Sequence, residues 1–577
     1  MNAARRAVVA TMAVAAAALT GCALPMTARN ADMRSQQALR QSDRALAETR
    51  AEAARRRDTV TEMQTEMAKL AAHEAELTRE LQAEHHAGGP TALPAVWGQT
   101  KARTESVFEM VTTQAAALAA ARYQAPAQIP SVLKSLSYVD YGKIAFRGRL
   151  PGWPKDSPFH VSLYPAGYLF TWPVEIHVVT SHTTLLAQLP AVASSDPQLA
   201  RRLPATVPTA GFSVYSHAAN TPLVNEFLSF LGASYLRGVG LGEAWGSSAR
   251  GVAVDTALPH RAEEFPYFRA FWIVAPGRNA RHLGFCALLD SPSLTGAYRF
   301  IVQPGTSTVV DVKAVLFQRR KVRRLGIAPL TSMFLQGRFS DHRYDRLIRS
   351  AHDSDGLLID TGNGPRVWRP LRNPHRLAVF RFPLKNPRGF GLIQRPRRAQ
   401  DYRALGMNYE NRPSVWVRPE GKWGSGHLLL VELPTDQQTN DNITVFWVPD
   451  SQGSPGRALA FHYRVVWTGG TPQGAKFGYV SATRYSYSAK RHSETYVVDF
   501  RGKRLADPAL STVKPEVWVH GAGRVTNAWV ARNGAAGHWR LQFVVVRTGP
   551  GPVRVQAALA DGKKQLTETW TDVFPLR

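Results

Sequence analysis

The sequence predicts a mainly β protein, in which a β-sandwich body follows an N-terminal helical stalk. Two contrasting textures predict this class. Residues 31–87 contain no proline or glycine and carry apolar residues at heptad spacing. From about residue 104 the chain consists largely of short alternating or β-branched runs between turn-forming residues. Because 577 residues exceed the usual size of one domain, we expect at least two domains.

The first 22 residues have the features of a bacterial lipoprotein signal. Arg5 and Arg6 precede the apolar run 7–19, which is too short to span a bilayer as a stable helix. The sequence Leu19-Thr-Gly-Cys22 follows, and it is typical of the site where such signals are cleaved and the new N-terminal Cys22 is lipidated. We therefore expect residues 1–21 to be a signal peptide. The alternative is an ordinary secretory signal with a chance cysteine.

Export and lipidation indicate a periplasmic protein held at a membrane. Residue 23 is Ala rather than Asp, which by resemblance to known lipoproteins favours the inner leaflet of the outer membrane over the inner membrane. The formal charge of +28 indicates anionic surroundings, such as lipid headgroups or an anionic glycan. Since the basic residues are spread along an exported chain, we expect no nucleic-acid partner. With Cys22 lipidated, Cys286 is expected to be a buried small hydrophobe without a disulfide.

Residues 22–103 are expected to hold the lipidated N-terminus, the stalk and a linker. Within them, apolar residues recur every seven positions at Leu39, Leu46, Ala53, Val60 and Met67. This pattern predicts a coiled-coil-like helix that reaches roughly 80 Å at 1.5 Å per residue. Such a helix serves as a spacer or as an arm for oligomerisation. The alternative is a helix that folds back on the body.

The body is predicted to be two β-sandwiches after one more helix over residues 104–122. Runs such as 159–163, 299–302 and 539–546 have the strand pattern of large antiparallel sheets. Turn-forming residues cluster at 439–455, which places the boundary between a domain at 104–442 and one at 443–577. The size and strand pattern of the last stretch are those of an immunoglobulin-like sandwich.

Neither the glycine-rich segment nor the histidines form a cofactor-binding or metal-binding motif. The glycines from Gly238 to Gly246 lack G-x-G-x-x-G spacing and a βαβ setting, so a tight turn is the better interpretation. Residues 246–251 are not a nucleophile elbow, because the second glycine falls one place late. Cysteine and histidine show no zinc-ligand spacing. We expect neither a cofactor nor a metal.

A candidate acid pair occurs in His352-Asp-Ser-Asp-Gly356. On a strand, Asp353 and Asp355 would face the same side, with Cα atoms roughly 6.5 to 7 Å apart. Acidic side chains on one wall of a groove suit glycoside hydrolysis, in which one acid protonates the leaving oxygen and a carboxylate activates water. The alternative is a plain turn, since Asp-Ser-Asp-Gly is also a common turn sequence.

Aromatic and basic residues near this pair are candidates for binding sugar. Aromatic rings pack on pyranose faces while charged groups bond the hydroxyls. The aromatic candidates are Trp368, Tyr402, Trp416 and Trp423, and the basic ones are Arg366, Arg369 and Arg418. The alternative is that the tryptophans fill a sandwich core.

Ordered sequence blocks from about residue 104 to the C-terminus resemble the osmoregulated periplasmic glucan biosynthesis family, its G and D proteins. The matching blocks are Glu226–Tyr235, Ser248–Gly251, Glu263–Pro266, Leu288–Ser291, Thr295–Tyr298, Ala328–Phe334, His352–Gly356, Trp368–Leu371, Gly389–Leu392, Arg412–Ser414 and Asn440–Asn442. Their number and order make the resemblance specific.

The resemblance implies a large N-terminal sandwich of the galactose-mutarotase-like supersandwich type with a long groove, followed by an immunoglobulin-like domain. It also implies a periplasmic role in making osmoregulated β-1,2-glucans, with inverting endo-β-1,2-glucanase activity in relatives. The β-1,2-glucan is the expected partner. A non-catalytic glucan-binding or assembly factor of the same pathway is the alternative function.

By motif match, Asp353 corresponds to the family's general acid. The resemblance leaves the base open, because relatives use a long proton relay; the candidates are Asp255, Glu263, Glu264 and Asp290. We take Asp353, Glu264 and Asp255 as catalytic candidates. The expected substrate-binding residues are Glu263, Tyr298, His352, Asp355, Trp368, Arg369, Tyr402 and Trp416. One departure is Ser350, which stands where G-type relatives often carry an acid.

Overall fold

The protein is described here by a computed structural model of the whole chain. It describes residues 95–189, 192–217, 224–337, 348–362, 364–404, 406–470, 477–490, 492–507, 510, 512–534, 538–562 and 564–574. The signal peptide, Cys22 and the stalk lie outside these residues and stay predictions. Among the described residues, no helix is long and apolar enough to cross a membrane.

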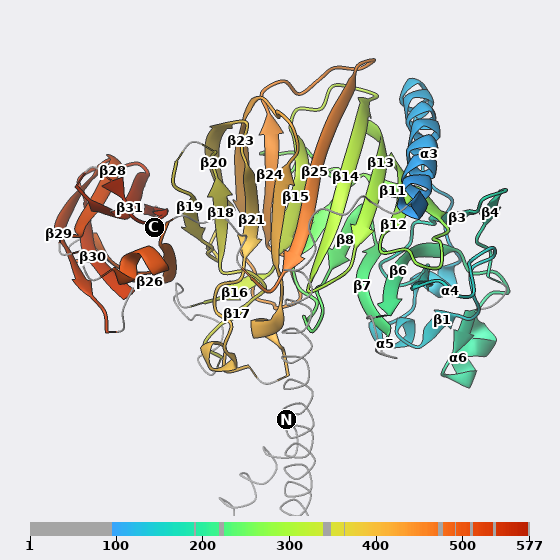
Figure 1. Cartoon of the computed structure of the whole chain (residues 1–577), viewed down its shortest axis with the longest axis horizontal. Helices are drawn as coiled ribbons and strands as arrows, with labels where there is room; N and C mark the ends of the chain where they lie inside the picture. The colour runs from blue at the N-terminus through green and yellow to red at the C-terminus, as the bar shows by residue number, and fades with distance from the viewer. Residues whose placement is uncertain are drawn as a thin grey trace, which may run out of the picture. The chain divides into compact units, whose positions relative to one another are not determined.

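Two large sheets form the body, in agreement with the predicted mainly β class (Figure 1). The ten-stranded sheet has the order β2-β6-β7-β8-β9-β15-β24-β23-β20, with β10 paired to β15. The large-sandwich part of the other sheet has the order β19-β18-β21-β22-β25-β14-β13-β12-β11-β3-β4. Neighbours within these two orders are antiparallel except for β11 with β3, which are parallel.

The strands from β2 to β15 are Phe159–Pro165 (β2), Glu175–Val179 (β3), Thr184–Leu186 (β4), Thr209–His217 (β6), Val224–Leu231 (β7), Tyr235–Gly238 (β8), Ser248–Arg250 (β9), Val252–Val254 (β10), Tyr267–Val274 (β11), Leu283–Asp290 (β12), Leu294–Gln303 (β13), Ser307–Gln318 (β14) and Leu325–Ser332 (β15). The later ones are Gly356–Asp360 (β18), Val367–Pro370 (β19), Ala378–Lys385 (β20), Gly389–Ile393 (β21), Ser414–Pro419 (β22), Ser425–Glu432 (β23), Ile443–Pro449 (β24) and Ala458–Thr468 (β25).

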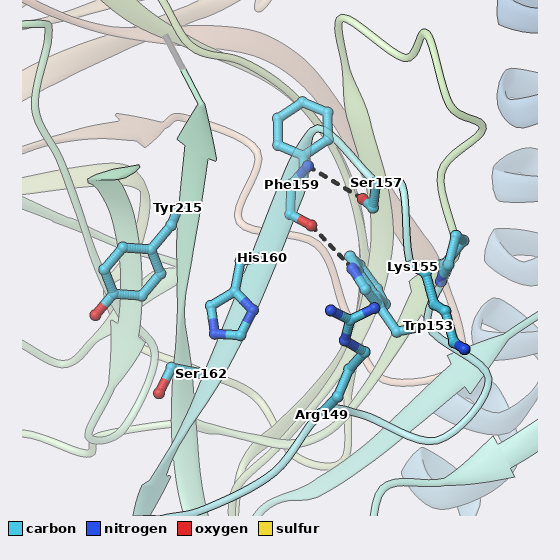
Figure 2. Close-up of a pocket in the computed structure, with 9 residues that line it drawn as sticks. Arg149, Trp153, Lys155, Ser157, Phe159, His160, Ser162 and Tyr215 are labelled. Atoms are coloured by element: carbon cyan, nitrogen blue, oxygen red, sulfur yellow. Dashed lines mark hydrogen bonds between the residues drawn. The ribbon is translucent and has the colours of Figure 1, made fainter. Parts of the chain in front are cut away.

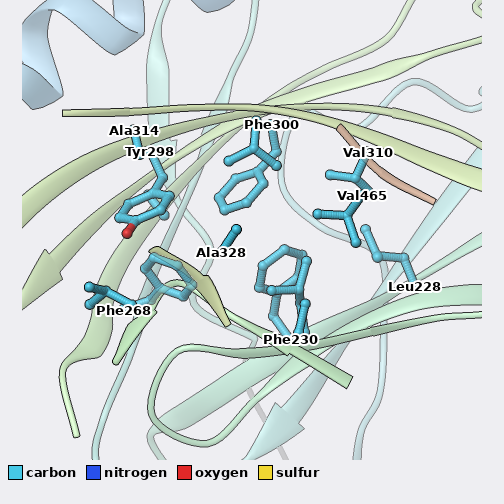
Figure 3. Close-up of a cluster of buried hydrophobic side chains, with 14 of the residues drawn as sticks. Leu228, Phe230, Phe268, Tyr298, Phe300, Val310, Ala314, Ala328 and Val465 are labelled. Atoms are coloured by element: carbon cyan, nitrogen blue, oxygen red, sulfur yellow. The ribbon is translucent and has the colours of Figure 1, made fainter. Parts of the chain in front are cut away.

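The main core lies between these two sheets and is rich in aromatic rings (Figure 3). Phe230 of β7 packs edge to face against Phe285 and Phe300 of the opposite sheet, with ring centroids 5.3 and 5.2 Å apart. Such aromatic pairs stabilise a core beyond the area that they bury. Alternate residues of the strands supply this core, which is the reason for the alternating pattern in the sequence.

Helix α3 (Ala95–Ala120) lies on the outer face of the second large sheet, which has fifteen strands in all, over strands β11 to β14 (Figure 1). Its Phe108, Val111 and Ala115 pack with Trp272 and Cys286 of β11 and β12. Because this part of the sheet is covered on both faces, every residue of β12 is buried, and all but the last, Asp290, are apolar or glycine. The predicted helix is therefore present, though it begins before residue 104, and Cys286 is buried as expected.

A smaller sandwich forms the C-terminal part. Its four-stranded sheet has the order β26-β27-β30-β29, and β28, β31 and β33 continue the larger sheet through β19. The bounds are Tyr479–Ser488 (β26), Ser493–Arg501 (β27), Lys514–Gly521 (β28), Gly523–Arg532 (β29), His538–Arg547 (β30), Val553–Asp561 (β31) and Thr569–Phe574 (β33). Strands β24 and β25, although they follow residue 442, pair within the large sheets. Strand pairing thus favours a boundary after Thr468 rather than near residue 443.

Short elements fill the remaining connections. The helices are α4 (Ser131–Lys134), α5 (Tyr138–Tyr141) and α6 (Pro197–Arg202), with 3-10 turns at Ala399–Asp401, Tyr409–Asn411 and Lys503–Ala506. The short strands are β1 (Ile144–Phe146), β5 (Val192–Ser194), β16 (Phe334–Gln336), β17 (Ala351–His352) and β32 (Lys564–Gln565). Strands β16 and β17 pair with each other at one end of β15, and they carry the chain toward the candidate acid.

Candidate functional site

Asp353 lies in the turn between β17 and β18, at the C-terminal end of β15. Its backbone N–H donates to the carbonyl oxygen of Met333 over 2.9 Å, which ties the turn to the residue after β15. Asp355 is held in the same turn, and its N–H donates to Ile393 over 2.8 Å. The two acids therefore lie in a turn, not on one face of a strand, so the expected strand geometry of the pair is wrong.

The carboxylate of Asp353 is buried and lies among charged groups of both signs. Arg412 donates from Nη1 to its Oδ1. Burial raises the pKa of Asp353 to about 6, against the opposing effect of the Arg412 guanidinium; Asp441 raises this pKa further and Arg237 lowers it. Arg237 and Asp441 are themselves paired at 3.3 Å. Burial outweighs the ion pair, so Asp353 can change its protonation state near neutral pH.

The Arg412 side chain is positioned by the segment that precedes β22. Its guanidinium lies over the ring of Tyr409, 4.3 Å from the ring centroid, and Nη2 donates to the carbonyl oxygen of Met407 over 3.2 Å. The Tyr409 hydroxyl donates to Gln438 Oε1 over 2.7 Å. A cation over an aromatic face is attracted by the ring quadrupole, so Tyr409 helps to hold Arg412 against the acid.

A buried network holds the backbone next to the acid. Gln394 Nε2 donates to the carbonyl oxygens of His352 and Tyr409 over 2.9 and 3.1 Å. Its Oε1 lies 2.9 Å from Nδ1 of His352, and the His352 ring stacks on Phe334. One amide thus links the residue before the acid with the segment that carries Arg412. His352 is only 1% exposed, so it is part of the buried support next to Asp353.

A row of polar residues, small except for Arg237 and mostly buried, crosses the ten-stranded sheet on the face opposite the main core. In register it runs Ser213, Ser229, Arg237, Ser248, Thr331 and Thr444, on strands β6, β7, β8, β9, β15 and β24. Ser248 and Thr331 hydroxyls are 2.5 Å apart. The alternate residues, such as Phe212 and Leu330, point into the core. Arg237 belongs to this polar row and also acts on Asp353, so the row leads to the acid.

The other two catalytic candidates lie at the opposite end of β15. Asp255 donates its N–H to Arg324, just before β15, whereas Asp353 contacts Met333, just after it. The length of this strand separates these contacts by roughly 25 to 30 Å. Glu264 lies beside Asp255, since its N–H donates to Val254 over 3.1 Å. The structure thus does not bring Asp255 and Glu264 together with Asp353.

Both distant acids, and the other acids proposed with them, are engaged by structural partners. Asp255 has a φ of 57°, accepts from the N–H groups of Arg323 and Arg324, and pairs with Arg261 at 2.7 Å. Glu264 accepts from the Ser293 N–H and hydroxyl over 2.9 and 2.7 Å. The remaining ion pairs are Glu263 with Arg250, and Asp290 with Arg269 and Arg319. Each carboxylate therefore holds a loop or a strand end.

Trp368, Arg369 and Trp416 do not form a sugar platform, because they pack between the two sandwiches. Trp368 and Trp416 belong to the core of the smaller sandwich, and Trp368 lies under Arg395, 3.4 Å from its guanidinium carbon. Arg369 is 1% exposed and lies 3.5 Å from Asp572 and from Glu432. These residues therefore join the domains, as in the core-filling alternative.

The last predicted binding residues are also buried. Tyr298 stacks on Phe300 in the main core and donates its hydroxyl to Gly251 over 2.9 Å (Figure 3). Tyr402 is fully buried, donates to Pro396 over 2.9 Å, and lies 5.2 Å from the His352 ring. Tyr402 thus packs behind His352, on the buried side of the site. Tyr298 is buried in the main core, where it has no direct access to a ligand. Asp355 borders a small cavity with Trp368 and Pro396, away from Arg412.

Comparison with known proteins agrees with the sequence resemblance. A family model described as periplasmic glucan biosynthesis protein, MdoG, matches residues 107–574. The chain belongs to this family. "Glucans biosynthesis protein G" of Ralstonia nicotianae is 39% identical over 490 residues, which cover 81% of this chain and 95% of that protein. The protein of the same name from Pseudomonas paraeruginosa is 40% identical over 483 residues, covering 81% and 92%.

Family motifs contained the site residues that sequence reasoning missed. Arg412 opens the block Arg412-Pro-Ser414, and Asp441 is the centre of Asn440-Asp-Asn442. Both blocks support the family match, but residue type alone gives neither charge a chemical role. Their spacing from Asp353 gives no signal, because the contacts join distant parts of the chain. Asn442 also fixes its block, since its Oδ1 accepts from the Phe334 N–H over 2.8 Å.

Proposed function

We propose that the protein acts in periplasmic glucan biosynthesis as an inverting endo-β-1,2-glucanase with Asp353 as its general acid. The membership of the family supports the pathway. The observation that carries the reaction is the burial of the Asp353 carboxyl beside Arg412; this burial raises the pKa of Asp353 to about 6. A general acid works best when its pKa is near the operating pH, and a carboxyl group of ordinary acidity would rarely be protonated there.

In this reaction the protonated Asp353 donates its proton to the leaving oxygen as the glycosidic bond breaks, while water attacks the anomeric carbon from the opposite face and gives up its proton to a general base. In the free protein the ion pair with Arg412 favours the ionised form, and a bound glucan that displaces water would favour the protonated form. Within the polar row, Arg237 is exposed and Ser229 is half-buried, so these two side chains are the ones that can contact sugar hydroxyls; Ser213, Ser248, Thr331 and Thr444 are buried. Asp255 and Glu264 lie at the far end of β15 and are engaged by structural partners, so neither is placed to take the proton of this water directly.

The alternative function is a glucan-binding or assembly factor without catalysis. The Arg412–Asp353 ion pair supports it, since a carboxylate held by a cation is a poor proton donor. Ser350, which is 2% exposed and stands where G-type relatives often carry an acid, supports it as well.

Incubation of the purified full chain with linear β-1,2-glucan tests the two functions. We expect shorter glucans whose new reducing ends have inverted anomeric configuration, measured by size analysis and NMR. Asp353→Asn should abolish this release, whereas Asp450→Asn, an exposed acid outside the site, should leave it unchanged. Glucan binding without any release of product would contradict the hydrolase and support the assembly factor.

A further inference from the structure

A polar pocket, separate from the Asp353 site, lies at the edge of the ten-stranded sheet. It has a volume of about 480 Å³, which is in the range of small-ligand sites. One wall is the loop 149–157, and the other is the outer face of β2 and β6. Figure 2 shows Arg149, Trp153 and Lys155 on the loop, and His160, Ser162 and Tyr215 on the strands.

The charge of this pocket is positive. Arg149 and Lys155 line it and are both exposed. Among the described residues that line the pocket, none is a carboxylate. The Asp156 carboxylate, which lies between two lining residues in sequence, is paired with Arg278 at 2.6 Å. Glu226, in register with Tyr215, accepts from the Tyr164 hydroxyl over 2.8 Å. Arg278 offsets the Asp156 charge, whereas a hydroxyl does not offset the charge of Glu226, which also acts on the lining residue Tyr215; Arg149 and Lys155 together outweigh this one carboxylate.

The loop that carries the two cations is pinned to the sheet. Trp153, only 7% exposed, donates its indole N–H to the carbonyl oxygen of Phe159 over 2.9 Å. The Phe159 N–H in turn donates to the Ser157 hydroxyl over 3.1 Å (Figure 2). Because both bonds join the loop to the first residue of β2, the pocket is pre-formed. A pre-formed site loses less conformational entropy when a ligand binds.

The strand wall offers groups that suit a sugar. The His160 and Tyr215 rings lie 5.8 Å apart at an angle of 53°, and Ser162 adds a hydroxyl. Ser162 pairs in register with Ser213, so the pocket joins the end of the polar row that leads to Arg237 and the acid. From Ser162 to Arg237 the row crosses three strand spacings, or roughly 14 Å. Ser213 is itself buried, so the row gives the register between the pocket and Arg237 and is not a continuous binding surface.

We propose that this pocket binds an anionic substituent, of the phosphate type, carried by a saccharide. Arg149 and Lys155 would neutralise the anion, and the His160, Ser162 and Tyr215 wall would contact the sugar that bears it. Guanidinium and ammonium groups are the usual partners of phosphate oxygens. The choice of a saccharide as the carrier rests on the proposed function, whereas the anion preference rests on the pocket alone.

Calorimetric titration of the full chain at low salt tests this site, with glucose, glucose 6-phosphate and inorganic phosphate as probes. We expect glucose 6-phosphate to bind at least tenfold more tightly than either glucose or inorganic phosphate. The double variant Arg149→Ala/Lys155→Ala should remove that preference. Arg147→Ala, an exposed arginine near the pocket that does not line it, is the matched control and should retain the preference.

The proposal is overturned if glucose and glucose 6-phosphate bind equally, or if the double variant binds the phosphate as the unaltered chain does. It is also overturned if vesicles of phosphatidylglycerol, rather than glucose 6-phosphate, bind and lose binding in the double variant. Asp353→Asn should keep the sugar-phosphate preference. If the unaltered chain prefers glucose 6-phosphate but does not hydrolyse glucan, that result contradicts the proposed function and not the anion site.

Discussion

The guanidinium of Arg412 pairs with the buried carboxylate of Asp353, although 59 residues separate them in the chain. The Arg412 cation lies over the Tyr409 ring at 4.3 Å and so reaches the acid from one fixed direction. The pKa of Asp353 depends on this pair, because burial raises the pKa and the Arg412 cation lowers it.

Removal of the charges around Asp353 should shift its titration in opposite directions. Arg412→Met removes a cation that lowers the pKa of Asp353, so the value should rise above about 6; Asp441→Asn removes an anion that raises it, so the value should fall. A general acid is active when protonated, so kcat/KM should decrease as the pH rises through this pKa. The pH profiles on linear β-1,2-glucan should show the decrease at higher pH for Arg412→Met and at lower pH for Asp441→Asn. Shifts of both variants in the same direction would contradict the electrostatic account.

Asp353→Asn should make the stability of the fold less sensitive to pH. Because the folded pKa, about 6, lies above the ordinary value of 3.8, the wild-type side chain favours the fold at low pH, and this contribution is lost as the pH rises through about 6. The asparagine lacks this loss. Between pH 5 and pH 8 the variant should gain roughly 1 kcal/mol in unfolding free energy relative to the wild type. Urea unfolding at both pH values measures the gain, and Asp450→Asn, with an exposed carboxyl, should show none.

Glu568→Ala should destabilise the junction of the two sandwiches. Arg395 donates to both Glu568 oxygens over 2.6 and 3.0 Å, and the two side chains are 4% and 5% exposed. Removing one partner of such a pair leaves a buried charge without compensation, which costs about 3 to 5 kcal/mol. Thermal unfolding provides the measurement. Arg278→Ala breaks the exposed pair with Asp156 and should cost about 1 kcal/mol or less; an equal cost for the two variants would show that burial is not the cause.

Gly389→Ala should destabilise the same region by overpacking. A Cβ atom at residue 389 would lie 2.2 Å from Trp416 Cζ2, so the indole has to move. Inserting a methyl group into a packed core costs about 1 to 3 kcal/mol. Gly305→Ala, where the Cβ would approach no atom closer than 3.4 Å, is the control and should change little. Comparison of the two midpoints in urea checks this, and equal midpoints would mean that Trp416 relaxes freely.

Few of the groups that surround Asp353 in the structure were among the predicted site residues. Asp353 carries a recognisable motif, and His352 and Tyr402 do lie beside it. Trp368, Arg369, Trp416 and Tyr298 have the composition of a sugar site and nevertheless pack in cores or at the domain junction. Residue type alone does not distinguish an aromatic ring that awaits a ligand from one that fills a core. Burial, which depends on the whole fold, makes that distinction.

The sequence by itself determined the mainly β class, the helix α3 ahead of the first strand and the family, because periodicity and ordered motifs are local properties of the chain. Only the tertiary structure decided which charges meet. Strand β15 keeps Asp255 and Asp353 at opposite ends, whereas the turns after β17 and before β22 bring Arg412 to Asp353. Electrostatic energy and burial depend on distance in space, and strand pairing sets that distance with no regard to separation along the chain.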